Sequence, residues 1–159
     1  MNKGHLLCMI VTCIFFLVAC TSDIDEQTAA EFFQKYIDLG EAFDREIIEL
    51  YADHAVIKAR RVYPPHGLER ILSLDGIKWK KLLLETLPMS RAKGDISKFS
   101  NIKIEVAGRK ATIKADRYSL LKCYADKEYY MVIERMQNDA YKIIEEFMVT
   151  QPQSDCTES

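Results

Sequence analysis

The stretch "ELYADHAVIKARR", Glu49–Arg61, lies where a helical pattern gives way to an extended one. The apolar residues around its start repeat at helical spacing: Phe43, Ile47, Ile48 and Tyr51. After it, "AVIKARRVY" is rich in β-branched residues and ends at Pro64-Pro65, which cannot continue a strand ladder. The stretch therefore predicts a second helix, a turn and a first strand, with Asp53 and His54 at the turn.

Asp53 and His54 have two interpretations. A carboxylate that orients an imidazole is a common general-base arrangement. Neighbouring residues of a strand point to opposite sides, however, so these two side chains cannot easily face each other. An aspartate also suits a turn, where its side chain bonds the backbone. A structural role is therefore favoured for Asp53, while His54 remains a candidate for a pocket.

Helical patterns flank this turn on both sides. "AAEFFQKYIDLG" predicts a first helix that Gly40 ends. Its apolar stripe consists of Ala29, Phe32, Phe33, Tyr36 and Ile37. Downstream, "SLDGIKWKKLLLETLP" predicts a third helix, which Ser73 or Asp75 caps and Pro88 closes.

Everything after Asp95 is predicted to be strand. "NIKIEVAGRKATIKADRY" alternates around a two-residue turn, Gly108-Arg109, in a register that pairs Ala107 with Lys110, Val106 with Ala111, Ile104 with Ile113 and Ile102 with Ala115. Two further strands, "KEYYMVIERM" and "AYKIIEEFMVT", flank a three-residue loop. That loop sets Glu134 opposite Lys142, Ile133 opposite Ile143 and Tyr129 opposite Phe147.

The predicted order of elements is helix, helix, strand, helix and then an antiparallel meander. N-terminal helices packed on a curved antiparallel sheet make an α+β domain. This order, with "LYADHAVI" and "GIKWKKLLLETL", resembles the nuclear transport factor 2-like superfamily over roughly Gln27 to Thr150. The superfamily includes ketosteroid isomerase, scytalone dehydratase and SnoaL-type cyclases. A cystatin-like variant and an unrelated α+β lipoprotein fold remain open.

The resemblance implies a cone-shaped fold that encloses a pocket, used for lyase or isomerase chemistry or for simple binding. In the register above, Glu145 lies opposite Met131 on an otherwise apolar face. Burial there would raise its pKa and suit it to general-base work. A half-covered face, or a lysine or tyrosine partner, would explain Glu145 equally well. Tyr129 is a further candidate because relatives use tyrosine hydroxyls to polarise a carbonyl, although tyrosines also pack sheets.

The first nineteen residues form the pattern of a secretory signal: Lys3, then an apolar run from Leu6 to Val18. "LVAC", residues 17–20, resembles the lipobox of bacterial lipoproteins. That resemblance implies cleavage before Cys20, acylation of Cys20 and a tether over 20–27. Thr21, in place of aspartate, favours the outer membrane of a Gram-negative cell, facing the periplasm. An uncleaved anchor or an ordinary signal is the alternative. The domain then spans 28–150, with a polar tail over 151–159.

The composition limits the kinds of partner and cofactor that we expect. The chain has 22 Lys and Arg against 24 Asp and Glu, and no basic block longer than a pair, which argues against nucleic acid. After cleavage, Cys123 and Cys156 remain and an oxidising periplasm would allow them to pair. Only His54 and His66 then remain, without a ligand cluster, so no metal is expected. There is no glycine-rich phosphate loop, and no cofactor is expected.

No spacing forces an acid and a base into one pocket. The sequence therefore favours a lipid-anchored, non-catalytic module that binds a small apolar ligand or an envelope protein. The alternative is a small lyase, isomerase or cyclase that uses Glu145 with His54, Asp53 or a tyrosine. Relatives also commonly dimerise through the open sheet face, so a homodimer is a further expectation.

Overall fold

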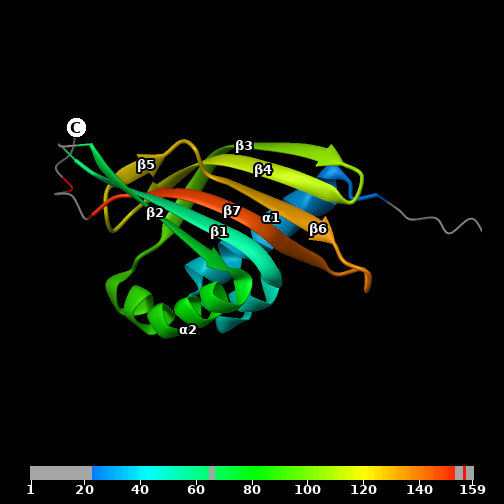
Figure 1. The fold of residues 1–159 in the computed structure, drawn as a ribbon, viewed down its shortest axis with the longest axis horizontal. Coiled ribbons are helices and arrows are strands. Elements are labelled where there is room, and N and C mark those ends of the chain that lie inside the picture. Colours follow the sequence, from blue (N-terminus) through cyan, green and yellow to red (C-terminus); the bar gives the residue numbers. More distant parts are fainter. Residues whose placement is uncertain (1–22, 65–66, 153–155, 157–159) are drawn as a thin grey trace, which may run out of the picture.

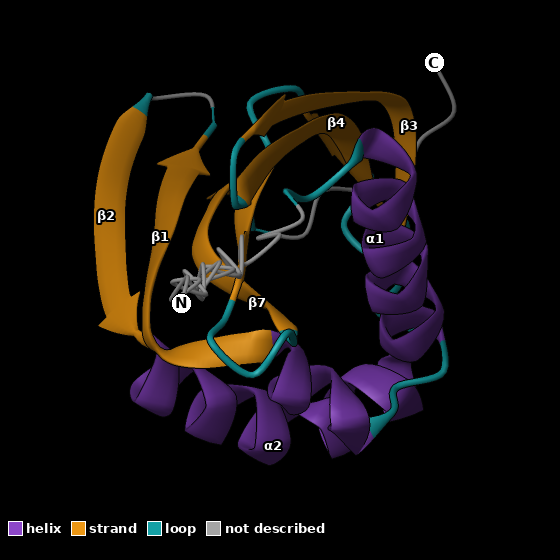
Figure 2. Ribbon diagram, turned by 90° about the vertical axis from the view of Figure 1, so that its right-hand side faces the viewer, coloured by secondary structure: helices purple, strands orange, loops and turns teal. Residues whose placement is uncertain are grey.

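The computed structural model describes residues 23–64, 67–152 and 156. Its elements are α1 (Glu26–Glu41), η1 (a 3-10 helix, Arg45–Leu50), β1 (Tyr51–Tyr63), β2 (Leu68–Asp75), α2 (Gly76–Lys93), β3 (Ser97–Ala107), β4 (Lys110–Ser119), β5 (Tyr124–Asp126), β6 (Tyr130–Arg135) and β7 (Tyr141–Thr150). The sheet has the order β2-β1-β7-β6-β4-β3, and β5 pairs with β4. The sheet curves strongly, and α1 and α2 lie on its concave side (Figures 1 and 2). The predicted α+β class, with helices on a curved sheet, is confirmed.

The sheet is mixed rather than wholly antiparallel. β7 pairs antiparallel with β6 but parallel with β1, while the other strand pairs are antiparallel. Tight turns determine the pairing of consecutive strands, so the meander could be predicted from local sequence. No local sequence pattern predicts that β7 pairs with β1, because the two strands lie at opposite ends of the domain's sequence.

All three predicted helices have different limits from those expected. The first, α1, runs past Gly40 to Glu41. The second is the short 3-10 helix η1, and β1 begins at Tyr51, before Asp53 and His54. The third, α2, continues through Pro88 to Lys93 and ends at Gly94, whose φ of 63° suits a left-handed cap. Asp75 is its N-cap, since its side chain accepts from the Lys78 N–H at 2.8 Å. Pro88 has no N–H to donate, so the helix lacks one backbone hydrogen bond there. The packing of α2 on the sheet compensates for this loss.

Strand β2 has no counterpart in the sequence prediction. It pairs with β1 from Val56–Asp75 to Tyr63–Leu68 without a break. Nearly all of its side chains are exposed, so apolar alternation does not mark it. Pairing with β1 makes it a strand.

The core lies between the helices and the concave face of the sheet. α1 packs on β3 and β4, and α2 packs on β1. Large side chains that are fully buried there include Phe33, Ile57, Ile113, Met131, Ile133 and Ile143. Gly76 opens α2 because a Cβ at this position would lie 1.9 Å from the Ala52 carbonyl oxygen. Its missing side chain lets α2 approach β1 closely.

The β3–β4 hairpin follows the predicted register near its turn and departs from it further out. Ala107–Lys110, Val106–Ala111 and Ile104–Ile113 pair as expected. The expected Ile102–Ala115 pair does not form, because the register shifts between Ser100 and Lys103. Asn101 has a φ of 52° within this irregularity. One irregular position thus changes every pair beyond it.

Cys123 and Cys156 form a disulfide, with their Cα atoms 5.3 Å apart. The bond fastens Cys156 to the connection between β4 and β5. Among the described residues, none of the helices has the length and apolar character needed to span a bilayer. The expected signal segment, Cys20 and His66 lie outside the described residues.

Candidate functional site

A bulge in β7 decides which carboxylate enters the core. β6 and β7 pair Ile133 with Ile143 but Val132 with Glu145, so Ile144 is the extra residue. Beyond the bulge, Glu146 lies opposite Met131 and the pairing of Tyr129 with Phe147 is replaced by Tyr130 with Phe147. The prediction that Glu145 faces the core is therefore wrong. The adjacent isoleucines 143 and 144 break the two-residue alternation and were the available signal for a bulge.

Glu146 is fully buried and accepts hydrogen bonds from three tyrosines. The hydroxyls of Tyr36 and Tyr129 donate to Oε1 at 2.9 and 2.8 Å. The hydroxyl of Tyr51 donates to Oε2 at 2.7 Å. We call these four residues the Glu146 cluster. Its members come from α1, β1, the β5–β6 connection and β7, so it joins the first helix to the last strand across the core.

Burial dominates the electrostatics of the Glu146 cluster. Desolvation raises the pKa of the Glu146 carboxyl above its ordinary value, although the tyrosine hydrogen bonds and the positive charge of Arg117 lower it. Burial, followed by the negative charge of Glu146, also raises the pKa of the Tyr36, Tyr51 and Tyr129 hydroxyls. Neutral tyrosines are therefore retained as donors. Aromatic side chains fill the surroundings, with Phe99 packing 5.2 Å from both Phe33 and Tyr129, between ring centroids.

Arg117 and Asp126 form a second buried polar group beside this cluster. Arg117 donates to the Val149 carbonyl at 2.7 Å and pairs with Asp126 at 3.5 Å. Asp126 accepts from the Val149 N–H at 2.7 Å. Both backbone groups of Val149 are thereby satisfied, which fastens the end of β7 to β4 and β5. Arg117 and Asp126 therefore have a structural role, which is to satisfy the backbone of β7.

Asp53 and His54 lie at a surface pocket of about 730 Å³ between β1, α2 and the β6–β7 turn. Asp53 makes a salt bridge to Lys80, which also lines the pocket. The hydrogen bond and charge of Lys80 hold the pKa of the Asp53 carboxyl below its ordinary value. An ionised carboxylate committed to a lysine is a poor general base. Asp53 therefore serves an ion pair, and His54 lies exposed beside it.

Glu145 lies on the face of the sheet opposite the core. Its Oε1 accepts from the Tyr130 hydroxyl at 2.6 Å, and this hydrogen bond raises the pKa of Tyr130 to about 12. Tyr129, by contrast, belongs to the Glu146 cluster. The four predicted candidates thus occupy three separate places: Asp53 with His54, Glu145 with Tyr130, and Tyr129 in the core. They do not converge on one pocket.

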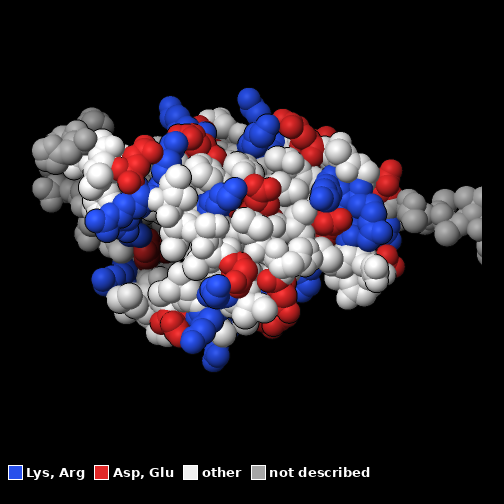
Figure 3. All heavy atoms as spheres, in the orientation of Figure 1, with Lys and Arg blue, Asp and Glu red and all other residues white. Residues whose placement is uncertain are grey.

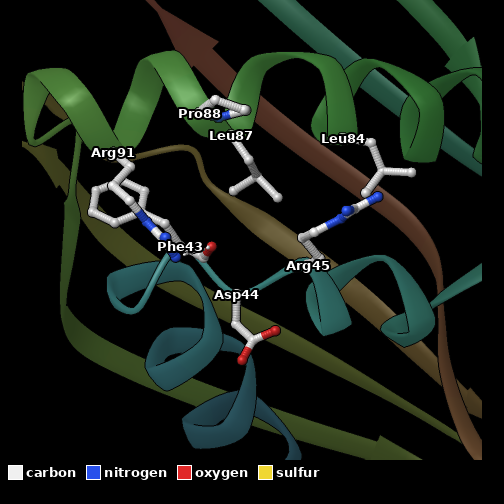
Figure 4. A pocket seen from close by; sticks show the side chains of 7 residues that line it. All are labelled: Phe43, Asp44, Arg45, Leu84, Leu87, Pro88 and Arg91. Carbon is white, nitrogen blue, oxygen red and sulfur yellow. Dashed lines mark hydrogen bonds between the residues drawn. The ribbon is translucent and has the colours of Figure 1, made fainter.

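A second pocket, of about 570 Å³, lies between α2 and the connection from α1 to η1. We call it the α2–η1 pocket; it is lined by Phe43, Asp44, Arg45, Leu84, Leu87, Pro88 and Arg91. The Leu84 and Leu87 side chains extend from α2 toward Arg45 and Phe43 (Figure 4). The Asp44 carboxylate points away from α2 in this view, and it accepts from the Glu46 N–H at 2.9 Å.

Arg91 fixes the backbone at one corner of the α2–η1 pocket. Its Nη2 donates to the carbonyls of Ala42 and Phe43 at 3.1 and 3.0 Å. Phe43 has a φ of 51°, a conformation that a side chain with a Cβ rarely adopts. Such a strained position persists only where the surroundings hold it. Sequence reasoning missed this pocket because it depends on the packing of the α1–η1 connection on α2.

Charged side chains of both signs are interleaved over the face of the molecule drawn in Figure 3. Among the described residues, no group of three or more His, Cys, Asp or Glu side chains could hold a metal ion. Candidate sites in the described part of the chain include the α2–η1 pocket, the surface pocket at Asp53 and His54, and the Glu146 cluster.

Comparison with known proteins gives likenesses in structure only. No protein-family model matches the chain. No curated protein matches it in sequence either.

Solved structures match over most of the chain. An NTF2-like (nuclear transport factor 2-like) protein of unknown function from Pseudomonas putida is 14% identical, with a TM-score of 0.59 over 78% of this chain and 84% of its own. A proposed ketosteroid isomerase from Parabacteroides distasonis is 14% identical, with a TM-score of 0.53 over 81% and 95%. A protein of unknown function with a cystatin-like fold from Nostoc punctiforme is 14% identical, with a TM-score of 0.53 over 80% and 92%.

At such low identities these likenesses establish the fold and leave the activity open. The fold expected from the sequence resemblance is confirmed: helices on a curved sheet, as in NTF2-like and cystatin-like proteins.

Proposed function

We propose that this chain is a lipid-anchored protein of the cell envelope whose domain binds a small, largely apolar anion without transforming it. The anchor rests on "LVAC" and Cys20, because several acyl chains on one residue hold a protein stably at a membrane. The binding function rests on one observation, the lining of the α2–η1 pocket: apolar side chains with an unpaired arginine.

The pocket has the size and composition of a small-molecule site. Its volume of about 570 Å³ lies within the usual range for ligand pockets. Four of the lining residues offer apolar surface: Phe43, Leu84, Leu87 and Pro88. Within the described part of the chain, Arg45 has neither an ion pair nor a hydrogen bond through its guanidinium. A planar guanidinium of this kind suits a carboxylate, sulfonate or phosphate.

The dispersed candidate residues favour binding over catalysis. A lyase or isomerase needs an acid or base within hydrogen-bond reach of its substrate. The carboxyl group of Glu146 is sealed in the core and satisfied by three hydroxyls. Asp53 is paired with Lys80, and Glu145 lies on the opposite side of the sheet. None of these three carboxylates lines the α2–η1 pocket. Asp44 does line it, but its carboxylate points away from α2 and accepts from the Glu46 N–H.

A fluorescence titration with 1-anilinonaphthalene-8-sulfonate, an apolar anion, tests the binding proposal. The protein is residues 20–159 with Cys20→Ser, which contains every described element and lacks the lipid. Arg45→Glu should weaken binding by about tenfold or more, because a charge-assisted hydrogen bond is lost and a like charge is added. Lys81→Glu makes the same charge change on an exposed part of α2 and should leave the affinity unchanged. Equal affinities for the two variants would refute the pocket as the binding site.

Lipidation has its own test. Mass spectrometry of the protein purified from bacterial membranes should find acyl chains on an N-terminal Cys20. The Cys20→Ser variant should leave the membrane fraction. An unmodified chain that begins at Met1 would rule the anchor out.

A further inference from the structure

The two edges of the sheet differ in how they are protected. β3 forms one edge; it is bulged between Ser100 and Lys103, and α1 packs against it. β2 forms the other edge, and its eight residues keep an unbroken register with β1. No strand of the described residues pairs with the outer side of β2. Natural proteins commonly blunt an exposed edge with bulges or charges, since free backbone groups can pair with another chain.

β2 also exposes large apolar side chains. Leu68, Ile71 and Leu72 are 56%, 73% and 49% exposed. Leu72 and Leu68 pair with Ala59 and Tyr63 of β1. These two β1 residues lie on the same face of the sheet as Ile57, which is part of the core. α2 does not cover this outer end of the hairpin, which projects past it in Figure 1. An unbulged edge with exposed leucines is suited to receive another strand.

An arginine pair lies between these leucines. Arg61 and Arg70 are directly opposite each other on β1 and β2. Their guanidinium carbons lie 5.4 and 5.9 Å from the Tyr63 ring centroid, so one ring holds both charges. Like charges in directly opposed positions destabilise a strand pair.

Neither arginine of this pair has a carboxylate partner among the residues described. Arg60, the neighbour of Arg61 on the opposite face, pairs with both Glu69 and Glu128. Acidic residues are thus available at this end of the sheet, yet they pair with Arg60 on the other face. Positive side chains, with acidic ones beside them, are visible at this end of the molecule, on the left of Figure 3.

We propose that the β2 edge binds an extended acidic segment of a partner protein, which adds to the sheet as a further strand. A carboxylate of that segment meets the Arg61–Arg70 pair, and apolar side chains on either side of it contact Leu68 and Leu72. Backbone pairing supplies affinity in such complexes, and the side chains on one face supply specificity. A second copy of this chain is a poor occupant, because β2 against β2 would bring four arginines together. The site is separate from the α2–η1 pocket and does not depend on it.

A designed peptide tests this proposal by fluorescence anisotropy. The probe is a fluorescein-labelled heptapeptide, Thr-Val-Thr-Glu-Thr-Val-Thr, which places one carboxylate between two valines on one face. The protein is the full mature chain with Cys20→Ser. We expect saturable binding that weakens as salt is added, and a loss of about tenfold or more in the Arg70→Glu variant. Lys103→Glu makes the same charge change at the other edge, on β3, and should bind as the wild type does.

Two control peptides separate strand addition from simple charge attraction. Replacing the glutamate by lysine should abolish binding, and N-methylation of alternate amides should abolish it as well. Binding that survives either change overturns the proposal. A dimer in analytical ultracentrifugation that Arg70→Glu disrupts would also overturn it, since the edge would then serve a second copy. Arg70 is exposed, so circular dichroism should show the variant folded, and its affinity for anilinonaphthalene sulfonate should be unchanged.

Discussion

Two polar groups of this molecule, the carboxyl group of Glu146 and the guanidinium of Arg45, differ in their burial and in their hydrogen-bond partners. In the core, the carboxyl group of Glu146 is satisfied by three tyrosine hydroxyls and is closed to solvent. At the α2–η1 pocket, Arg45 lies beside apolar side chains with no partner in the described part of the chain. A buried carboxyl group with all its hydrogen bonds made helps to specify the fold, whereas an exposed arginine without a protein partner at a pocket is available to a ligand. The buried carboxyl group of Glu146 is therefore out of reach of a substrate at the surface.

The strongest test of this contrast compares two adjacent glutamates. Glu146→Ala leaves three hydroxyls without their acceptor and opens a cavity, so the free energy of unfolding should fall by about 3–5 kcal/mol. Glu145→Ala removes a partly exposed side chain with one tyrosine partner and should cost less than about 1 kcal/mol. Urea denaturation followed by circular dichroism measures both. Similar losses for the two variants would mean that Glu146 does not organise the core.

Deleting single hydroxyl groups gives a smaller and more specific effect. Tyr51→Phe removes a buried donor to Glu146 and should lower the free energy of unfolding by about 1–2 kcal/mol. Tyr130→Phe removes a donor to Glu145 on the outer face, where a change below about 0.5 kcal/mol is expected. Thermal and urea unfolding of both variants provide the measurement. A larger loss for Tyr130→Phe would reverse the assignment of inner and outer faces.

The pH dependence of stability probes the same carboxyl group. Burial raises the pKa of Glu146 in the folded state, so the folded protein binds this proton more tightly than the unfolded chain does. Its contribution to stability is therefore full below the ordinary pKa and is lost as the pH rises through the raised pKa. The free energy of unfolding of the wild type, relative to Glu146→Gln, should fall as the pH is raised from about 4 to about 8. A difference that stays constant with pH would show that the carboxyl group does not titrate in this way.

The smallest expected effect concerns the ion pair of Asp53 and Lys80, at the surface pocket between β1, α2 and the β6–β7 turn. Asp53 is largely exposed, and exposed ion pairs contribute little in water. Lys80→Ala should therefore leave the free energy of unfolding nearly unchanged. It should also return the pKa of Asp53 toward its ordinary value, which NMR titration of the carboxyl carbon measures. An unchanged Asp53 titration would mean that Lys80 does not hold this carboxylate.

Local signals determined much of the fold. The apolar stripe of α1, the turn at Gly108-Arg109 and the loop at Gln137–Asp139 each depend on a few neighbouring residues, and each was predicted. The pairs closest to the two turns follow the expected register for the same reason. Turn chemistry and side-chain periodicity act over short distances, so one sequence is enough to reveal them.

The candidate site was less predictable, because one residue reverses every side chain that follows it. Ile144 bulges out of β7, so Glu146 rather than Glu145 enters the core. The adjacent isoleucines 143 and 144 indicate a break in the alternation, but they do not show which glutamate enters the core, since the three tyrosines that receive Glu146 come from distant segments. The α2–η1 pocket likewise requires α2 to continue past Pro88 and pack on the α1–η1 connection.

The sequence by itself determined the type of most elements, the chain reversals at Gly108-Arg109 and Gln137–Asp139, the α+β class and the features that predict a lipid anchor. Only the tertiary structure decided that β7 lies parallel to β1, that β2 forms an open edge and that Glu146 meets Tyr36, Tyr51 and Tyr129. The physical reason is the sequence separation over which each kind of interaction acts. Turns and periodicity are set by residues a few positions apart, whereas strand order and burial depend on contacts between segments that meet only in the folded chain.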